Sequence, residues 1–137
     1  MLSLVREHGL TVDKVQGVEA WIHQRRLQHT NRPQPGSALD AKFSLQYVVA
    51  RALMDGHVSL AHFEDQAHTD PRVQALLPRI NVAAYDDSQF APINHFGGAV
   101  RVTLTDGSVL QASVEQALGR TSAHPLPQHL LQAKFAL

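Results

Sequence analysis

The segment DAKFSLQYVVARALMDG, residues 40–56, decides how this chain should fold. Its second half is apolar on nearly every side, which is typical of a helix buried over most of its surface. Asp40 can cap the start of this helix and Gly56 can end it. The first two turns carry four polar side chains, namely Lys42, Ser44, Gln46 and Tyr47. Because unpaired polar atoms are costly to bury, this polar end predicts a small-molecule site.

Patterning on either side of this helix predicts the other elements. Toward the N-terminus we expect a helix over Leu2 to His8 ended by Gly9, a strand over Val15 to Arg26, and a loop over Leu27 to Ser37. After the central helix we expect short helices from Ser59 to Phe63 and from Asp70-Pro71 onward. A strand should follow over Ile80 to Tyr85, then a loop over Asp86 to Asn94.

Two further strands, residues 99–104 and 108–114, are joined by Thr105-Asp106-Gly107, and Asp-Gly between alternating segments is a strong hairpin signal. The chain should close with a loop over Gly119 to Pro127 and a helix over Gln128 to Phe135. We therefore predict an α+β fold, a two-layer sandwich of about four mostly antiparallel strands with helices packed on one face.

Composition narrows the classes of function. A chain of 137 residues predicts a single domain, and its net charge of zero argues against a nucleic-acid binder. No apolar run approaches the roughly 20 residues that span a bilayer, and the first ten residues do not resemble a signal peptide, so we expect a soluble cytoplasmic protein. Cysteine is absent, and none of the nine histidines is spaced three or four residues from another. We therefore expect no metal site.

The order of several short motifs resembles one known family. The chain runs through an Asn31-Arg32-Pro33 loop, the Tyr47 helix ending at Gly56, Asp70-Pro71-Arg72-Val73, the Leu104-Thr105-Asp106-Gly107 hairpin, Pro125-Leu126 and Ala133-Lys134-Phe135. This order and spacing are similar to those of the smaller, C-terminal domain of the MmgE/PrpD family. Its members are cofactor-independent lyases and isomerases that act on small polycarboxylates such as 2-methylcitrate and cis-aconitate.

The resemblance implies a division of labour between two domains. Family members have a large all-helical domain and a smaller α+β lid, with the site in the cleft between them. Residues 1–137 would then be the lid alone. Its partners would be the absent helical domain and a polycarboxylate substrate, and a homodimer is also compatible with the resemblance. Most catalytic groups of the family belong to the helical domain. We therefore expect this fragment to be inactive by itself, and to expose an apolar patch where its partner belongs.

Tyr47 is our candidate catalytic residue, because the resemblance places the family's active-site tyrosine there. A phenol can donate a hydrogen bond to a carboxylate or pass on a proton. By spacing alone, a buried tyrosine that only satisfies its hydroxyl is the better interpretation. Trp21, which alternates with strand residues, should be a packing residue or part of the surface against the missing domain.

Four residues are candidates for substrate binding. Lys42 would lie in the first turn of the helix, where the dipole disfavours a cation, so an anionic partner would explain it; a surface lysine is the alternative. Arg32 suits bidentate carboxylate binding or, equally, a structural salt bridge. Ser44 can bind substrate or merely the local helix backbone. His124 lies in a loop that the resemblance places near the cleft.

A function of another class remains open at this point. The balanced charge and the incomplete catalytic set also fit a stand-alone module that binds carboxylates or another protein without catalysis.

Overall fold

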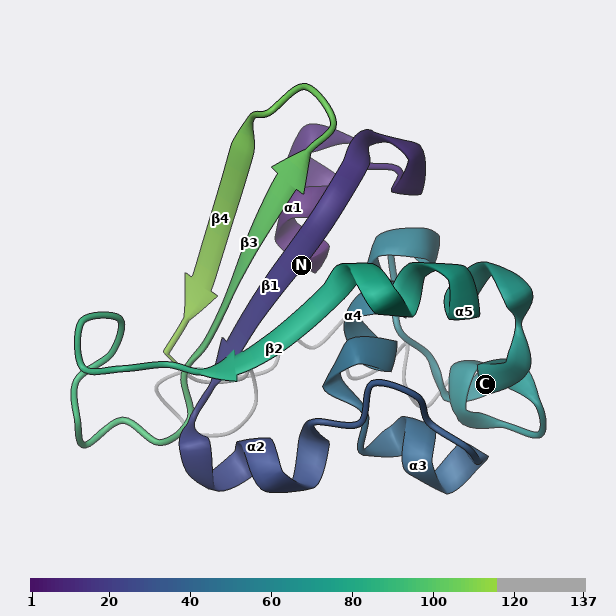
Figure 1. Cartoon of the computed structure of the whole chain (residues 1–137), viewed down its shortest axis with the longest axis horizontal. Helices are drawn as coiled ribbons and strands as arrows, with labels where there is room; N and C mark the ends of the chain where they lie inside the picture. Colours follow the sequence, from purple (N-terminus) through teal and green to yellow (C-terminus); the bar gives the residue numbers. More distant parts are fainter. Residues whose placement is uncertain (116–137) are drawn as a thin grey trace, which may run out of the picture.

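The computed structural model describes residues 1–115, in which four strands form one mixed sheet (Figure 1). Their order across the sheet is β2-β1-β3-β4. The strands are β1 (Val15–Ile22), β2 (Ile80–Ala84), β3 (Gly98–Leu104) and β4 (Val109–Val114). The predicted hairpin at Asp106-Gly107 joins β3 to β4, where Gly107 takes a φ of 89°. The α+β class is therefore confirmed.

The prediction that the sheet is mostly antiparallel was wrong in one pairing. β3 runs antiparallel to both β1 and β4, but β2 runs parallel to β1, with Val18 opposite Ile80. The chain between β1 and β2 is long, as the crossover between parallel strands must be, and it is largely helical, as such crossovers usually are. Alternation along a strand shows which side chains share a face but not the direction of the neighbour, so the sequence pattern could not settle this point.

The helical elements are five α-helices and four short 3-10 turns within residues 1–115. The α-helices are α1 (Leu2–His8), α2 (Gln24–Thr30), α3 (Ala38–Lys42), α4 (Leu45–Asp55) and α5 (Pro71–Leu76). The 3-10 turns are η1 (Val12–Lys14), η2 (Leu60–Phe63), η3 (Ala67–Thr69) and η4 (Leu77–Arg79). Gly9 and Gly56 end α1 and α4 in the left-handed region, as predicted.

The single helix expected from Asp40 onward is two helices. Ser37 caps α3, and Ser44 interrupts the helical path and caps α4 by accepting a hydrogen bond of 3.1 Å from the backbone N–H of Tyr47. Asp40 is therefore not a cap. It lies within α3, and its carboxylate accepts from Arg32 and from the backbone of Gly36.

The first strand is shorter than predicted. β1 ends at Ile22, and α2 occupies residues that we had assigned to the strand and to the following loop. His23 caps α2, because its Nδ1 accepts from the backbone N–H of Arg25 at 3.0 Å. Histidine is not among the usual capping residues, so this helix start has no clear sequence signal.

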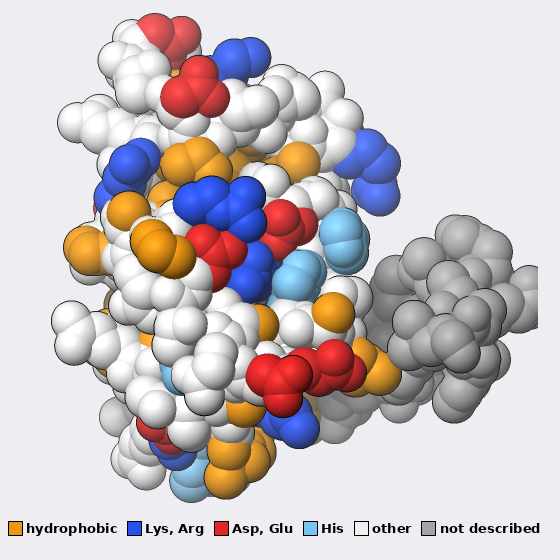
Figure 2. Space-filling view, turned by 90° about the vertical axis from the view of Figure 1, so that its right-hand side faces the viewer, with side chains coloured by type: hydrophobic (Ala, Val, Ile, Leu, Met, Phe, Trp, Pro, Cys, Tyr) orange, Lys and Arg blue, Asp and Glu red, His pale blue; other side chains and the backbone are white. Residues whose placement is uncertain are grey.

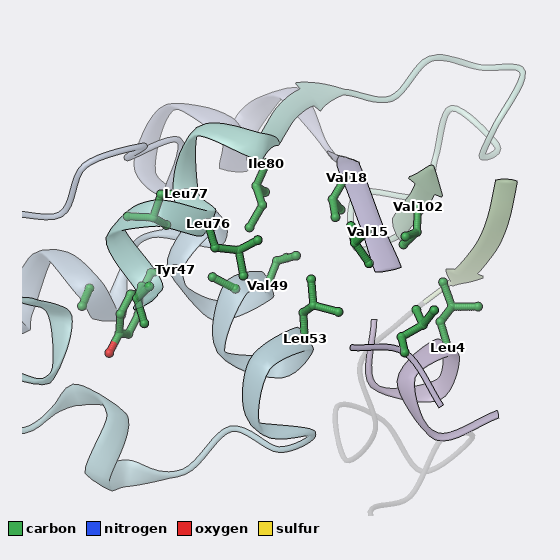
Figure 3. Packing of buried hydrophobic residues seen from close by; sticks show 14 residues of the cluster. Leu4, Val15, Val18, Tyr47, Val49, Leu53, Leu76, Leu77, Ile80 and Val102 are labelled. Atoms are coloured by element: carbon green, nitrogen blue, oxygen red, sulfur yellow. The ribbon is translucent and has the colours of Figure 1, made fainter. Parts of the chain in front are cut away.

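The core brings one face of the sheet together with α1, α4 and α5 (Figure 3). Val18 of β1, Val102 of β3 and Ile80 of β2 belong to the same buried cluster as Leu53 of α4 and Leu76 of α5. Val73 and Leu76 of α5 and the following residue, Leu77, are buried in this core as well. No helix in the described part of the chain has both the length and the apolar character to cross a membrane. The predicted closing loop and helix, residues 119–135, lie outside the described residues.

Candidate functional site

The start of α4 holds the loop that precedes α3 through two buried polar side chains. Ser44 Oγ donates to the carbonyl oxygen of Arg32 at 2.7 Å, and Gln46 Oε1 accepts from the backbone N–H of Arg32 at 3.1 Å. Gln46 Nε2 also donates to Asn31 Oδ1 at 2.7 Å. The polar residues at this helix end therefore fix the position of the Asn31-Arg32 loop, and the buried Ser44 hydroxyl already donates one hydrogen bond and accepts another.

The Arg32 side chain is paired but remains accessible. Its Nη1 lies 2.6 Å from Asp40 Oδ1, its Nε donates to the carbonyl oxygen of His29 at 3.1 Å, and the side chain is 42% exposed. The guanidinium also lies 5.9 Å from the ring centroid of Phe43. An ion pair this exposed is worth about 0–1 kcal/mol, so an incoming carboxylate could compete for Arg32 at little cost.

Lys42 occupies a different place from the one predicted. It lies in the last turn of α3 and not in the first turn of the Tyr47 helix, so the argument from an unfavourable helix dipole was wrong. The side chain is exposed, and no ion pair joins it to another residue of the described part of the chain. Its ammonium group is therefore available to an anion.

Beside Lys42 the surface has a hollow of about 220 Å³. It lies where the end of β1, α2 and the start of α4 meet, on the side of the molecule where α2 and α3 are seen in Figure 1. Its walls are mostly apolar, and it is lined by Ile22, Arg26, Thr30, Lys42, Phe43, Ser44, Leu45 and Val48. Two of these residues are cations and none is acidic, so the hollow favours a ligand or partner with negative charge.

Tyr47 lies on another side of α4 and is fully buried. Its hydroxyl donates to the carbonyl oxygen of His62 and accepts from Arg51 Nε at 3.1 Å, while its ring meets Phe63 edge-on at 5.7 Å between centroids. Figure 3 shows the hydroxyl directed away from the apolar cluster. The catalytic role of Tyr47 stays a prediction. In this structure the phenol would first have to leave His62 before it could meet a substrate.

Around the buried Arg51 lies an ionic cluster that was not among the predicted site residues. Arg51 is 5% exposed, and its guanidinium donates to the carbonyl oxygen of Ala67 at 2.9 Å and to Asp55 Oδ2 at 3.3 Å, with Asp70 Oδ2 at 3.7 Å. Figure 2, viewed from the side of α5, shows basic, acidic and histidine side chains gathered on one face. The signal was present, since Tyr47, Arg51 and Asp55 are spaced four residues apart and so share one side of a helix.

The hydrogen bonds of His62 determine its tautomer. Nδ1 accepts from the backbone N–H of Ser59 at 3.1 Å, so the proton of the neutral ring is on Nε2, which lies 3.1 Å from Asp55 Oδ2 and donates to it. Burial, and then the positive charge of Arg51, lower the pKa of His62 below its ordinary value of 6.5. The ring is therefore neutral at pH 7 and ties η2 to α4. Neither nitrogen has a free lone pair with which to act as a base.

The face of the sheet opposite the core has a second, wider hollow of about 380 Å³. Trp21, Arg101 and Gln111 line it from three strands, and Phe90 closes one side. The guanidinium of Arg101 lies 5.1 Å from the ring centroid of Trp21, and 3.7 Å separates its Nη1 from a carboxylate oxygen of Glu19. Trp21 thus belongs to a half-open polar surface and not to the core.

Two further predictions concern ligands. Within residues 1–115, no three His, Asp or Glu side chains come together as a metal site would require. His124, predicted to bind substrate, lies outside the described residues. The structure therefore brings Arg32, Lys42 and Ser44 into one neighbourhood, at the start of α4, and leaves Tyr47 on another side of that helix.

The sequence comparisons identify the family. Residues 1–137 match the family model of the MmgE/PrpD C-terminal domain, so the chain belongs to the MmgE/PrpD family and corresponds to that domain. The resemblance found from the motifs is thereby confirmed.

Its relatives include enzymes with two different names. The chain is 37% identical to the 2-methylcitrate dehydratase of Cupriavidus necator, over 93% of this chain and 28% of that protein. It is 29% identical to the 2-methylcitrate dehydratase of Salmonella typhimurium, over 94% of this chain and 28% of that protein. It is 30% identical to the cis-aconitate decarboxylase of Homo sapiens, over 80% of this chain and 22% of that protein. The chain thus spans about a quarter of the length of these relatives.

Proposed function

We propose that this chain is the lid domain of a cofactor-independent lyase or isomerase that acts on small polycarboxylates. Family membership supports the proposal, because the names of all three relatives refer to substrates with several carboxylate groups. The structural observation that carries it is Lys42. This ammonium group has no acidic partner among the described residues and lies at the edge of a hollow that contains no acidic side chain.

The candidate residues differ in how many of their present hydrogen bonds or ion pairs must break before each can contact a substrate. Lys42 can bind a substrate carboxylate as it stands. Arg32 can join it by exchanging Asp40 for the substrate, at the low cost of an exposed ion pair. Tyr47 would stabilise or protonate the developing charge only after its hydroxyl is released from His62. In the structure Ser44 supports the loop that carries Arg32, and through it the position of the guanidinium.

The proposed division of labour follows from the reaction chemistry. Dehydration and decarboxylation of such substrates both need a proton to be removed or delivered next to a carboxylate. Among the candidate residues of this chain that the structure describes, none has a free basic lone pair. The bases would therefore come from the much longer part of the protein that the relatives possess outside this span.

Turnover measurements test the proposal directly. The chain is assayed with cis-aconitate, 2-methylcitrate and iminodisuccinate, alone and together with a separately produced helical domain. We expect turnover only in the combination, and a raised KM when Lys42→Gln replaces the wild-type chain. Lys14→Gln, an exposed lysine on η1, is the matched control and should change nothing. Turnover by the chain alone would refute the division of labour, and tight carboxylate binding without turnover in any combination would favour the stand-alone binding module.

A further inference from the structure

The wider hollow, on the sheet face opposite the core, takes no part in the proposed function. Its volume of about 380 Å³ is within the range of about 300–1,000 Å³ that is usual for small-molecule sites. The register of the strands explains why the surface is hollow there. Trp21, Ala99 and Ser113 are paired side by side across β1, β3 and β4. Ala99 and Ser113 are too small to fill the space beside the indole ring, so they form a floor.

The two ends of this hollow differ in chemistry. At one end lie Arg101 and Gln111, which are paired one step further along β3 and β4, about 7 Å from the floor residues. At the other end lies Phe90, from the loop that joins β2 to β3 (Figure 1). The Phe90 ring lies against Gly97, just before β3 begins. A molecule over the floor would therefore meet a cation and an amide at one end and an aromatic ring at the other.

The guanidinium of Arg101 has unused hydrogen-bond donors. Its Nε is buried without a hydrogen-bond partner, and within residues 1–115 the guanidinium donates no hydrogen bond. A carboxylate oxygen of Glu19 lies 3.7 Å from Nη1, which is too far for a hydrogen bond, and Glu19 does not line the hollow. The Arg101 side chain is 43% exposed, so a ligand can reach it. A carboxylate, with two acceptor oxygens, is the group that a guanidinium binds best.

We propose that this hollow binds a small monocarboxylate with a flat apolar body, such as an aromatic acid. The carboxylate accepts from Arg101 and Gln111, and the body lies over the floor between Trp21 and Phe90. The site is separate from the hollow beside Lys42, because that hollow is on the other face of the sheet. The inference does not rest on the proposed function.

Charge and shape together select this class of ligand. Arg101 is the one charged side chain among the described residues that line the hollow, so a second carboxylate on the ligand would find no cation there. A ligand without an apolar part would leave the Trp21 and Phe90 rings without a contact. We therefore expect an aromatic monocarboxylate to bind better than a polycarboxylate such as citrate.

Fluorescence of Trp21, the only tryptophan in the sequence, reports on binding at this place. The 137-residue chain is titrated with benzoate, with benzamide, which has the same shape without the charge, and with citrate. We expect benzoate to change the emission until it saturates, with half-saturation at about 1 mM, as for other small fragments. Benzamide should bind about tenfold or more weakly, because it cannot form the charge-assisted hydrogen bonds. Citrate should neither change the emission nor displace benzoate.

Two pairs of variants assign the signal to the hollow. Arg101→Gln should weaken benzoate binding by about tenfold or more, whereas Arg6→Gln, at an exposed position on α1, should leave it unchanged. Ser113→Leu should fill the floor and abolish binding. Val109→Leu is its matched control, because it lies on the same strand and the same face but outside the hollow. Ser113 and Val109 are both exposed, so the urea midpoints of these two variants should stay close to that of the wild type.

Several results would overturn the proposal. They are the absence of a saturable change with benzoate, equal binding of benzamide, displacement of benzoate by citrate, and unaltered binding in Arg101→Gln or Ser113→Leu.

Lys42→Gln distinguishes this inference from the proposed function. If this variant weakens benzoate binding, the ligand lies in the hollow beside Lys42, and the inference fails while the proposed function gains support. If benzoate binding is unchanged in Lys42→Gln and lost in Ser113→Leu, the inference stands, whatever the outcome of the turnover measurements.

Discussion

Removing the guanidinium of Arg51 should destabilise the chain more than any exposed arginine substitution. Arg51→Ala leaves the carboxylates of Asp55 and Asp70, whose side chains are 23% and 19% exposed, without their shared cation. It also removes the donors to the carbonyl oxygen of Ala67 and to the Tyr47 hydroxyl. Breaking a buried ion pair from one side costs about 3–5 kcal/mol. Because both carboxylates keep some contact with water, we expect the lower end, about 3 kcal/mol.

The measurement is urea unfolding of the 137-residue chain followed by tryptophan fluorescence. With an m-value of about 1–3 kcal/mol/M, a loss of about 3 kcal/mol lowers the urea midpoint by about 1–3 M. This loss is a large part of the free energy of unfolding, which is about 5–15 kcal/mol for a typical domain. Arg51→Lys keeps the charge but not the forked donors, so its midpoint should lie between those of the wild type and Arg51→Ala.

The control is Arg6→Ala, an exposed position on α1, which should change the free energy of unfolding by less than about 0.5 kcal/mol. If Arg51→Ala costs no more than Arg6→Ala, the cluster is not a stabilising element. Arg51 would then not stabilise the contact between α4, η2 and α5.

Three further predictions concern the pH response and the packing. Burial and Arg51 lower the pKa of His62 below 6.5, so the unfolded chain binds this proton more tightly than the folded chain. The free energy of unfolding should therefore fall as pH drops below about 6.5. Urea midpoints measured against pH should fall less steeply in His62→Asn than in the wild type. A Cβ at Gly97 would lie 2.7 Å from ring atoms of Phe90, so Gly97→Ala should lower the thermal midpoint, with a cost of about 1–3 kcal/mol for overpacking. Leu53→Ala should cost about 2–5 kcal/mol by chemical denaturation, because Leu53 is buried between α4 and the rest of the core, and a loss below 1 kcal/mol would contradict that placement.

The candidate site was partly predictable, and its misses have different causes. The sequence pattern indicates the polar end of the central helix, and Arg32 is by its chemistry as suited to a salt bridge as to a substrate. The structure shows the salt bridge with Asp40, eight residues away. It also shows Ser44 interrupting the helix, which moved Lys42 to the end of α3 and reversed its relation to the helix dipole. The ion pair of Arg32 joins two segments, which spacing along one helix cannot show. The cap at Ser44 and the spacing of Arg51 are local features of the sequence.

The chemistry of neighbouring residues alone determined where several helices and one hairpin of this protein begin, end or turn. Gly9 and Gly56 end helices because glycine adopts a positive φ without steric cost, Asp70-Pro71 starts one, and Asp106-Gly107 turns a hairpin. Each of these outcomes depends only on neighbouring residues. The order of the motifs along the chain, which indicated the family, can likewise be read without the three-dimensional structure. Tertiary structure alone decided that β2 runs parallel to β1, and that Tyr47, Arg51 and His62 close on one another within the chain. Both depend on where distant segments meet, because pairing direction and the burial of a polar group are properties of two surfaces and not of one stretch of sequence.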